Sequence, residues 1–215
     1  MIRVMIVDDH ELVRTGLARV IGDAQGIEVV AEANCGEVAL NTARQYRPDV
    51  VLMDVNMPGI GGMEATSKLL KVQPDLKIIV VTVHADGPFP NKLLQAGAMG
   101  YLTKGCACEE MIAAIRTVYE GKPYIDRCVA QNIALSYTPQ AQESPFEKLS
   151  QRELQVVMML IQGFRGQEIS DRLCLSPKTV STYRRRVYDK LQIQSDVELT
   201  QLAMLNQLMD EKNHD

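Results

Sequence analysis

The sequence lacks any apolar run long enough to cross a membrane. A membrane-spanning helix needs about 20 consecutive apolar residues, and no stretch approaches that length although 46% of the 215 residues are hydrophobic. The first residues, from Met1 to Val7, reach acidic residues at once and have no small-residue cleavage site. We therefore expect a β-strand there and no signal peptide.

Cysteine is scarce and scattered. The five cysteines are odd in number and widely separated, namely Cys35, Cys106, Cys108, Cys128 and Cys174. This pattern predicts neither a disulfide framework nor a structural zinc site, and it favours a cytoplasmic location. A metal shared by Cys106, Cys108 and His84 is an alternative, but two reduced thiols in a loop are the more ordinary interpretation.

The chain has no overall excess of positive charge, since its net charge is -4, yet one region is basic. From Lys148 to Lys190 there are nine Lys or Arg against four Asp or Glu, a net charge of +5, so the remainder carries -9. An acidic body joined to a small basic module is a charge asymmetry that suggests a nucleic-acid partner for the basic part.

Short apolar runs alternate with amphipathic helical stretches over the first 121 residues. Runs such as Val50 to Met53 are continuously apolar, as in strands covered by helices on both faces. Five βα units with right-handed crossovers predict a flavodoxin-like, doubly wound α/β fold with a parallel five-stranded sheet. The predicted strands are Arg3–Val7, Glu28–Ala33, Val50–Asp54, Ile78–Thr82 and Gly100–Leu102, and the predicted helices are Leu12–Ile21, Gly36–Tyr46, Gly62–Lys71, Phe89–Ala96 and Glu109–Tyr119.

The rest of the chain predicts a linker and then an all-α domain. Residues 122–147 contain one or two helical turns at Ala130–Leu135 and then a polar, proline-punctuated segment, which is typical of a linker. Residues 148–215 predict four helices, with a frayed tail from Asp210. Capping signals mark three of their starts: Ser150 with Glu153, Ser176 before Pro177, and Ser195 with Glu198. The predicted helices are Gln151–Gln162, Glu168–Leu173, one from Pro177, and Val197–Leu208.

Polar residues follow four of the predicted strands. Asp8 and Asp9 follow the first, Asp54 ends the third, Thr82 ends the fourth, and Lys104 lies just beyond the fifth. Ligands of open α/β sheets bind beyond the carboxyl ends of the strands, so we expect these side chains to share one region. Three carboxylates repel one another unless a cation lies among them, and Mg²⁺ is the default hard ion for oxygen ligands. Simple capping by each Asp is the plainer alternative, which suits Asp8 alone but not all five positions.

Essentially all of residues 1–121 resembles the receiver domains of two-component response regulators. The matching residues are Asp8-Asp9, the run from Leu52 to Gly59, Thr82, Tyr101 and Lys104. The resemblance implies that Asp54 is the phosphoacceptor, taking a phosphoryl group from a phosphohistidine of a sensor histidine kinase. It also implies that Asp9, Asp54 and the Asn56 backbone carbonyl hold Mg²⁺, with Asp8 contributing directly or through water.

The same resemblance implies a switch. Lys104 would pair with a phosphoryl oxygen, while Thr82 would turn its hydroxyl toward the phosphoryl group and let the Tyr101 ring move inward. Many receivers follow this lysine with a proline in a cis bond, and Gly105 in that place puts the cis peptide in doubt. His84 either tunes dephosphorylation or is an exposed loop histidine.

The helix that begins at Pro177 has two different faces. At about 100° per residue, Val180, Val187 and Leu191 gather on one side, and polar side chains form the opposite stripe, as in a helix that enters a DNA major groove. A solvated face is the plain alternative, but the preceding helix and the turn at 174–176 complete a helix-turn-helix of positive charge. The candidate base contacts are Ser181, Thr182 and Arg185, and the candidate phosphate contacts are Lys178, Thr179, Tyr183, Arg184, Arg186 and Lys190.

Residues 148 to about 205 resemble the four-helix DNA-binding domain of the LuxR, NarL and FixJ type. The matching residues are Leu149 to Glu153, Glu168-Ile169, Leu175-Ser176, Thr179-Val180 and Lys190-Leu191. Where that family has Asn-Lys and Lys-x-His, this chain has Gly166-Gln167 and Ser181-Thr182-Tyr183. The first departure removes a phosphate-contacting lysine, and the second changes the base-reading surface.

Over its whole length the chain resembles the GacA, UvrY, SirA and VarA group of global regulators. The runs that carry this resemblance are Asp54 to Gly62, Thr103 to Gly105 and Leu173 to Val180. It implies a hybrid sensor kinase of the GacS/BarA type as phosphodonor and promoters of small regulatory RNA genes of the carbon-storage system as targets. We expect a homodimer on double-stranded DNA, because one such module buries too little surface for tight specific binding.

Three alternative functions fit less well. A phosphohydrolase that uses Asp54 as nucleophile needs a second Asp two residues on, and Asn56 stands there instead. A ligand-sensing regulator independent of phosphorylation would not need the full acid, Thr and Lys set, and the basic helix face disfavours a receiver with only protein partners. The chain is therefore not expected to be an enzyme, apart from catalysing its own phosphorylation and dephosphorylation.

Overall fold

The computed structural model describes residues 1–83, 87–137, 144–206 and 208. These residues form two compact units: the first comprises residues 1–83 and 89–134, and the second comprises residues 87–88 and those from Leu135 on. His84, positions 138–143 of the predicted linker and the tail at 210–215 lie outside the described residues. The predictions made for those positions therefore stay predictions.

The first unit is built on a parallel sheet with the strand order β2-β1-β3-β4-β5-β6. The strands are β1 Ile2–Val7, β2 Ile27–Ala33, β3 Val50–Met53, β4 Lys77–Thr82, β5 Gly100–Thr103 and β6 Tyr124–Ile125. The five predicted strands are confirmed to within one residue at each end. The predicted count of five is corrected to six, because a two-residue strand is too short to leave an apolar pattern and forms only where β5 offers it a free edge.

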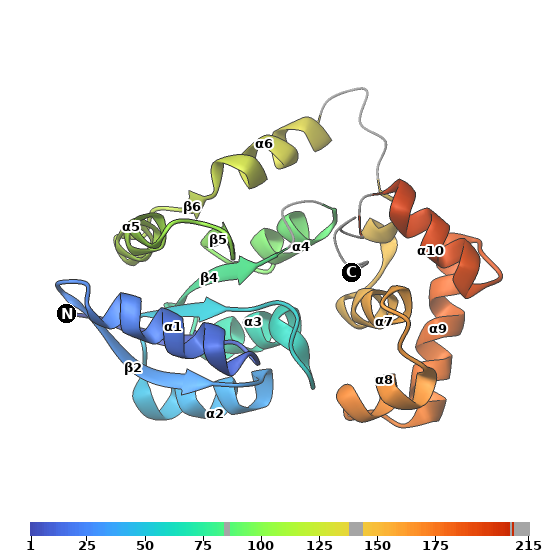
Figure 1. Ribbon diagram of the computed structural model, residues 1–215, viewed down its shortest axis with the longest axis horizontal. Coiled ribbons are helices and arrows are strands. Elements are labelled where there is room, and N and C mark those ends of the chain that lie inside the picture. The colour runs from blue at the N-terminus through green and yellow to red at the C-terminus, as the bar shows by residue number, and fades with distance from the viewer. Residues whose placement is uncertain (84–86, 138–143, 207, 209–215) are drawn as a thin grey trace. The chain divides into compact units, whose positions relative to one another are not determined.

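Helices cover both faces of this sheet (Figure 1). Ile21 of α1 and Ile115 of α5 pack with Ile6 of β1 on one face, whereas Ala43 of α2 packs with the adjacent Met5 on the other. Alternate residues of a strand point to opposite faces, which is why both must be apolar here. The helices are α1 Glu11–Gly22, α2 Gly36–Tyr46, α3 Gly61–Val72, α4 Phe89–Gln95 and α5 Cys108–Tyr119, and after β6 comes α6 Arg127–Ser136, within which the division between the two units falls.

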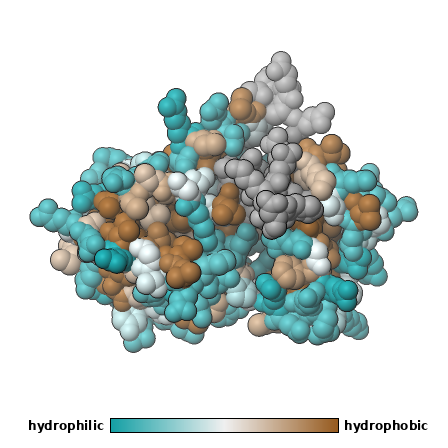
Figure 2. Space-filling model, viewed as in Figure 1, coloured by the Kyte–Doolittle hydropathy of each residue, from teal (hydrophilic) through white to brown (hydrophobic). Residues whose placement is uncertain are grey.

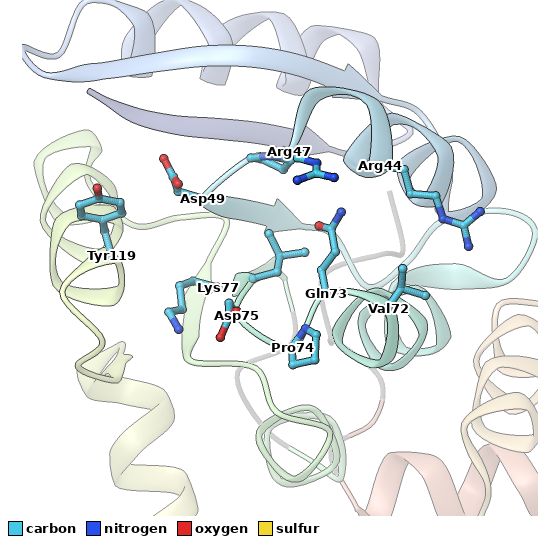
Figure 3. Close-up of a pocket in the computed structure, with 11 residues that line it drawn as sticks. Arg44, Arg47, Asp49, Val72, Gln73, Pro74, Asp75, Lys77 and Tyr119 are labelled. Atoms are coloured by element: carbon cyan, nitrogen blue, oxygen red, sulfur yellow. The ribbon is translucent and has the colours of Figure 1, made fainter.

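A cavity of about 640 Å³ lies at the amino ends of β3 and β4. Figure 3 shows Arg44 and Arg47 on one side of it and Pro74, Asp75 and Lys77 on the other. The predicted carboxylate site lies at the opposite, carboxyl ends of the same strands, so the cavity and the carboxylates are separate features of the first unit.

The second unit is a helical bundle, as predicted. Its helices are η1 Pro145–Lys148, a short 3-10 helix, then α7 Gln151–Ile161, α8 Gly166–Arg172, α9 Pro177–Leu191 and α10 Asp196–Leu205. The capping box is confirmed: Ser150 Oγ accepts the Glu153 N–H at 3.3 Å and the Glu153 carboxylate accepts the Ser150 N–H at 2.7 Å. Over the described part of the chain, no helix has the length and hydropathy needed to span a bilayer.

Candidate functional site: a carboxylate cluster and a basic helix

Three aspartates lie together at the carboxyl end of the sheet. Asp8 and Asp9 follow β1, Asp54 follows β3, and these two strands are neighbours. Asp8 and Asp54 are buried, at 2% and 3% exposed, whereas the Asp9 side chain is 29% exposed. Two buried carboxylates of like charge are unfavourable without a cation beside them.

Lys104 supplies part of that positive charge. Its Nζ lies 2.7 Å from Asp8 Oδ2 and 2.8 Å from Asp54 Oδ2. Burial acts to lower the pKa of Lys104, but attraction to Asp54 and hydrogen bonds to Asp54 and Asp8 outweigh it and raise the pKa above its ordinary value. The ammonium group therefore stays charged and links the ends of β1, β3 and β5, and Lys104 lies in the same region as the carboxylates, as the sequence predicted.

The two oxygens of Asp54 have different surroundings. Oδ1 accepts the Val55 N–H at 2.7 Å and the Asn56 N–H at 3.4 Å, whereas Oδ2 faces Lys104. Burial raises the pKa of Asp54 to about 6, although Lys104 acts in the opposite direction. At neutral pH the carboxylate is thus mostly ionised, and Oδ2 is the oxygen to which no backbone N–H of the described residues donates.

The loop after Asp54 closes tightly against its backbone. The Gly62 N–H donates to the Val55 carbonyl oxygen at 3.0 Å. A Cβ atom at Gly62 would lie 1.8 Å from the Asp54 carbonyl oxygen, so no other residue fits without moving the loop. The first turn of α3 is in this way held against the candidate phosphoacceptor.

The cluster can hold a metal ion. Ligand atoms of Asp8, Asp9, His10 and Asp54 all lie within 4.8 Å of one another. Within the described chain, Oδ1 of Asp9 is buried and accepts no hydrogen bond, although His10 Nδ1 is 3.0 Å away. A buried carboxylate oxygen without a donor is the kind of ligand that a hard divalent cation takes.

His10 is the residue of this cluster that the sequence reasoning missed. Its backbone N–H donates to Asp8 Oδ1 at 2.8 Å, and its Nδ1 lies 3.3 Å from the same oxygen. The available signal was its position directly after Asp8-Asp9, at the start of α1. The role predicted for the Asn56 carbonyl as a metal ligand stays a prediction.

The two predicted switch residues are both fully buried. Thr82 ends β4 and Tyr101 lies on β5, each with no exposed surface. The Lys104 N–H donates to the Thr82 carbonyl oxygen at 2.8 Å, which ties the lysine to the end of β4. The Tyr101 ring is therefore already inside the fold. The Lys104–Gly105 peptide bond is trans.

In the second unit, α9 has the two faces that its sequence predicts. Val180, Val187 and Leu191 are buried, whereas Ser181 and Arg185 on the other side are exposed. Helix α8 and a turn with Cys174 in the left-handed region, at φ 52°, precede α9. Ser170 Oγ donates to the Leu175 carbonyl oxygen at 2.6 Å and fixes that turn. The predicted helix-turn-helix geometry is present.

Two of the predicted phosphate contacts are engaged in ion pairs within the unit. Arg184 pairs with Asp196 of α10 at 2.5 Å and donates to Tyr188 Oη at 3.0 Å. Lys190 pairs with Glu153 of α7 at 2.6 Å. These contacts hold α9 against its neighbours, a role that the sequence alone did not indicate. The remaining basic candidates, Lys178, Arg185 and Arg186, make no ion pair among the described residues.

Two family descriptions match the chain, one for each unit. The response regulator receiver domain matches residues 4–116, and the luxR family of bacterial regulatory proteins matches residues 147–203. The first range contains the carboxylate cluster and the second contains α7 to α9. Both are the families that the sequence resembles.

Similar proteins span nearly the whole chain. The response regulator GacA of Pseudomonas aeruginosa is 56% identical over 98% of this chain and 99% of its own length. The response regulator UvrY of Escherichia coli K12 is 54% identical over 95% of this chain and 94% of its own length. Among solved structures, a complex of the two-component response regulator RcsB with DNA has a TM-score of 0.58 at 25% identity, covering 94% of this chain and 98% of that one.

Proposed function

The chain belongs to the response regulators that join a receiver domain to a luxR-type regulatory domain, and on this premise we propose that it is phosphorylated on Asp54 and binds promoter DNA to regulate transcription. The observation that carries the first part is the pairing of a buried Asp54 with Lys104 inside an acidic cluster. The observation that carries the second is the polar face of α9 in a helix-turn-helix.

Phosphoryl transfer needs little more than the groups already in place. Oδ2 of Asp54 attacks the phosphorus of a phosphohistidine on a sensor kinase; the new O–P bond forms as the P–N bond breaks, and the electron pair returns to the imidazole nitrogen. The Val55 and Asn56 N–H groups hold Oδ1 and so aim Oδ2. Lys104 lies where it can pair with an oxygen of the transferred group.

Mg²⁺ is the metal we propose for the cluster, held by Asp8, Asp9 and Asp54 with the Asn56 carbonyl. Bound there, it would neutralise the charge that gathers on the phosphoryl oxygens. The buried Oδ1 of Asp9, which accepts no hydrogen bond from the described residues, and the tight grouping of carboxylate oxygens support this choice. The chain is proposed to catalyse only its own phosphorylation and dephosphorylation, and no other reaction.

DNA binding is proposed through α9, with Ser181, Thr182 and Arg185 toward base edges. The phosphate contacts proposed from the sequence keep that role, although Arg184 and Lys190 must share it with their ion pairs.

We also propose a homodimer. Its support is the exposed apolar surface of α10, where Val197, Met204 and Leu205 are 67%, 58% and 83% exposed and hydrophobic colour shows in Figure 2.

The finer assignments rest on similarity to GacA and UvrY. A hybrid kinase of the GacS/BarA type is the proposed phosphodonor, and genes for small regulatory RNAs of the carbon-storage system are the proposed targets. The proposed location is the cytoplasm, in keeping with five free thiols.

The deciding experiment compares wild type with Asp54→Ala in two assays. Acetyl phosphate should label the wild type, and Asp54→Ala should abolish the labelling; labelling that persists in this variant would disprove the assignment. Asp75→Ala removes an exposed carboxylate beside the distant cavity and serves as the matched control that keeps full labelling. Genome-wide DNA occupancy of the same variants then shows which promoters depend on phosphorylation.

A further inference from the structure

After helix α5, which extends just past the end of the receiver family match, the chain forms strand β6 and helix α6. Strand β6 runs parallel to β5, with Tyr124 opposite Gly100 and Ile125 opposite Tyr101. The Tyr124 N–H donates to the Met99 carbonyl oxygen at 3.0 Å, and the Asp126 N–H donates to the Tyr101 carbonyl oxygen at 2.9 Å. The residues that lead away from the first unit are thus bonded to the strand that carries the predicted switch tyrosine.

Asp126 connects β5 to α6 through its side chain as well. Its Oδ2 accepts the Thr103 hydroxyl at 3.1 Å, and its Oδ1 accepts the Cys128 N–H at 2.7 Å. The second contact is the geometry of an N-cap, because α6 begins at Arg127. One half-buried carboxylate therefore holds the end of β5 with one oxygen and starts α6 with the other.

Thr103 directly precedes the lysine of the carboxylate cluster. Lys104 Nζ lies 2.8 Å from Asp54 Oδ2, which is the oxygen that would take the phosphoryl group, since Oδ1 is held by two backbone N–H groups. A phosphoryl group on Oδ2 needs the space that Nζ occupies, so the lysine must retreat. Any such shift of Lys104 acts on Thr103 and hence on Asp126.

We propose that Asp126 is a positioning residue: it sets the end of β5 that carries Lys104, and it loosens β6 and α6 when Asp54 is phosphorylated. The proposal rests on the proposed function, namely phosphorylation of Asp54. A strand of two residues with few hydrogen bonds is easily shifted by a change of charge nearby. Tyr124 Oη donates to Glu110 Oε1 of α5 at 3.3 Å. This second contact holds the start of β6 to α5 when the contacts of Asp126 weaken.

Amide hydrogen exchange of the full chain tests the response. Acetyl phosphate with Mg²⁺ should speed exchange at the Asp126 and Cys128 amides at least about threefold in the wild type, and not in Asp54→Asn. The Ala39 amide, bonded to the Cys35 carbonyl oxygen at the start of α2, is the internal control and should not change. If acetyl phosphate does not phosphorylate the wild type, the proposed function is overturned. If the wild type is phosphorylated but the exchange rates of the Asp126 and Cys128 amides do not change, only the proposed role of Asp126 and β6 is overturned.

Variants at the contact test positioning separately from stability. Asp126→Ala and Thr103→Val should each change the half-life of the acyl phosphate at least about threefold, and the double variant should add little to either. Asp126→Asn should restore the wild-type half-life, because its amide oxygen can accept from Cys128 and its amide nitrogen can donate to Thr103. A purely structural role would lower the unfolding midpoint of Asp126→Ala and leave the half-life unchanged, which would overturn the proposal.

Discussion

The carboxylate cluster of the first unit and the polar face of α9 in the second unit both gather charges of one sign, but the first buries them and the second leaves them in water. Asp8 and Asp54 are almost inaccessible, and this burial, with a smaller contribution from repulsion by Asp8, raises the pKa of Asp54 to about 6 although Lys104 opposes it. The exposed arginines of α9 carry like charges at little cost, because water and salt screen them. A buried charge cluster is thus sensitive to pH and metal, whereas an exposed one is sensitive to salt and to a charged partner.

The largest expected effect is on stability at the cluster. The folded-state pKa of Asp54 is raised from 3.8 to about 6. The contribution of protonated Asp54 to the free energy of unfolding is therefore fully present below about pH 3.8, and it is lost as the pH rises to about 6. At pH 7 the ionised group therefore costs about 2 to 3 kcal/mol. Asp54→Asn removes that cost and should raise the free energy of unfolding by a similar amount in urea titrations without divalent ions. The gain should shrink strongly at pH 4; an equal gain at both pH values would contradict this account.

Specific DNA recognition is the next largest effect, and it concerns the exposed face. Arg185→Ala should reduce discrimination between a specific promoter and random DNA by about 1–3 kcal/mol if Arg185 makes a bidentate pair with guanine. Competition binding at fixed salt measures this. Arg186→Ala, on the flank of the same helix, is the matched control and should lower the affinity for all DNA sequences by a similar factor. Uniform weakening by Arg185→Ala would place Arg185 on phosphate instead.

Metal binding should offset the repulsion within the cluster. Mg²⁺ at about ten times its dissociation constant should raise the free energy of unfolding of the wild type by about 1.4 kcal/mol. Asp9→Asn should lose most of this gain, since the buried Asp9 Oδ1 accepts no hydrogen bond from the described residues, although His10 Nδ1 lies 3.0 Å away. Thermal unfolding with and without Mg²⁺ is the measurement, with Asp75→Asn as the control that keeps the gain. An undiminished Mg²⁺ effect in Asp9→Asn would exclude Asp9 as a ligand.

The smallest expected effect concerns the pair that joins α9 to α7. Lys190→Met should lower the free energy of unfolding by about 1 kcal/mol, because Glu153 is 3% exposed and loses its cation, while the exposed Lys190 limits the loss by screening. Burial raises the pKa of Glu153, but Lys190 and Ser150 outweigh it and lower the pKa. The contribution of the Glu153–Lys190 pair to the free energy of unfolding is therefore present above pH 4.5 and is lost as the pH falls below that value. Lys178→Met, on the same helix, should have no comparable effect in the same urea titrations.

Much of both units follows from patterns within short segments. The continuously apolar run of β3 and the alternating helices predicted the doubly wound sheet, and the Ser150–Glu153 box predicted the start of α7. The cluster of Asp8, Asp9, Asp54 and Lys104 also followed, because the carboxyl ends of parallel strands meet at one edge. These features depend on local periodicity and on one topological rule.

Other features of the structure could not be predicted from the sequence, because each depends on a partner residue that is distant along the chain. Strand β6 exists through hydrogen bonds to β5, and the ion pairs of Arg184 and Lys190 join residues 12 and 37 positions apart. No pattern within a short window encodes such contacts.

The sequence by itself determined the two folds, the identity of the acidic cluster and the basic, amphipathic character of α9, because these depend on residue type and spacing. Only the tertiary structure decided that Asp54 presents Oδ2 to Lys104, that Tyr101 is buried, and that Asp126 accepts a hydrogen bond from Thr103 at the end of β5. The physical reason is that burial and hydrogen-bond geometry are properties of chain segments brought together in space. The sequence specifies the side chains, and the fold determines which of them become neighbours.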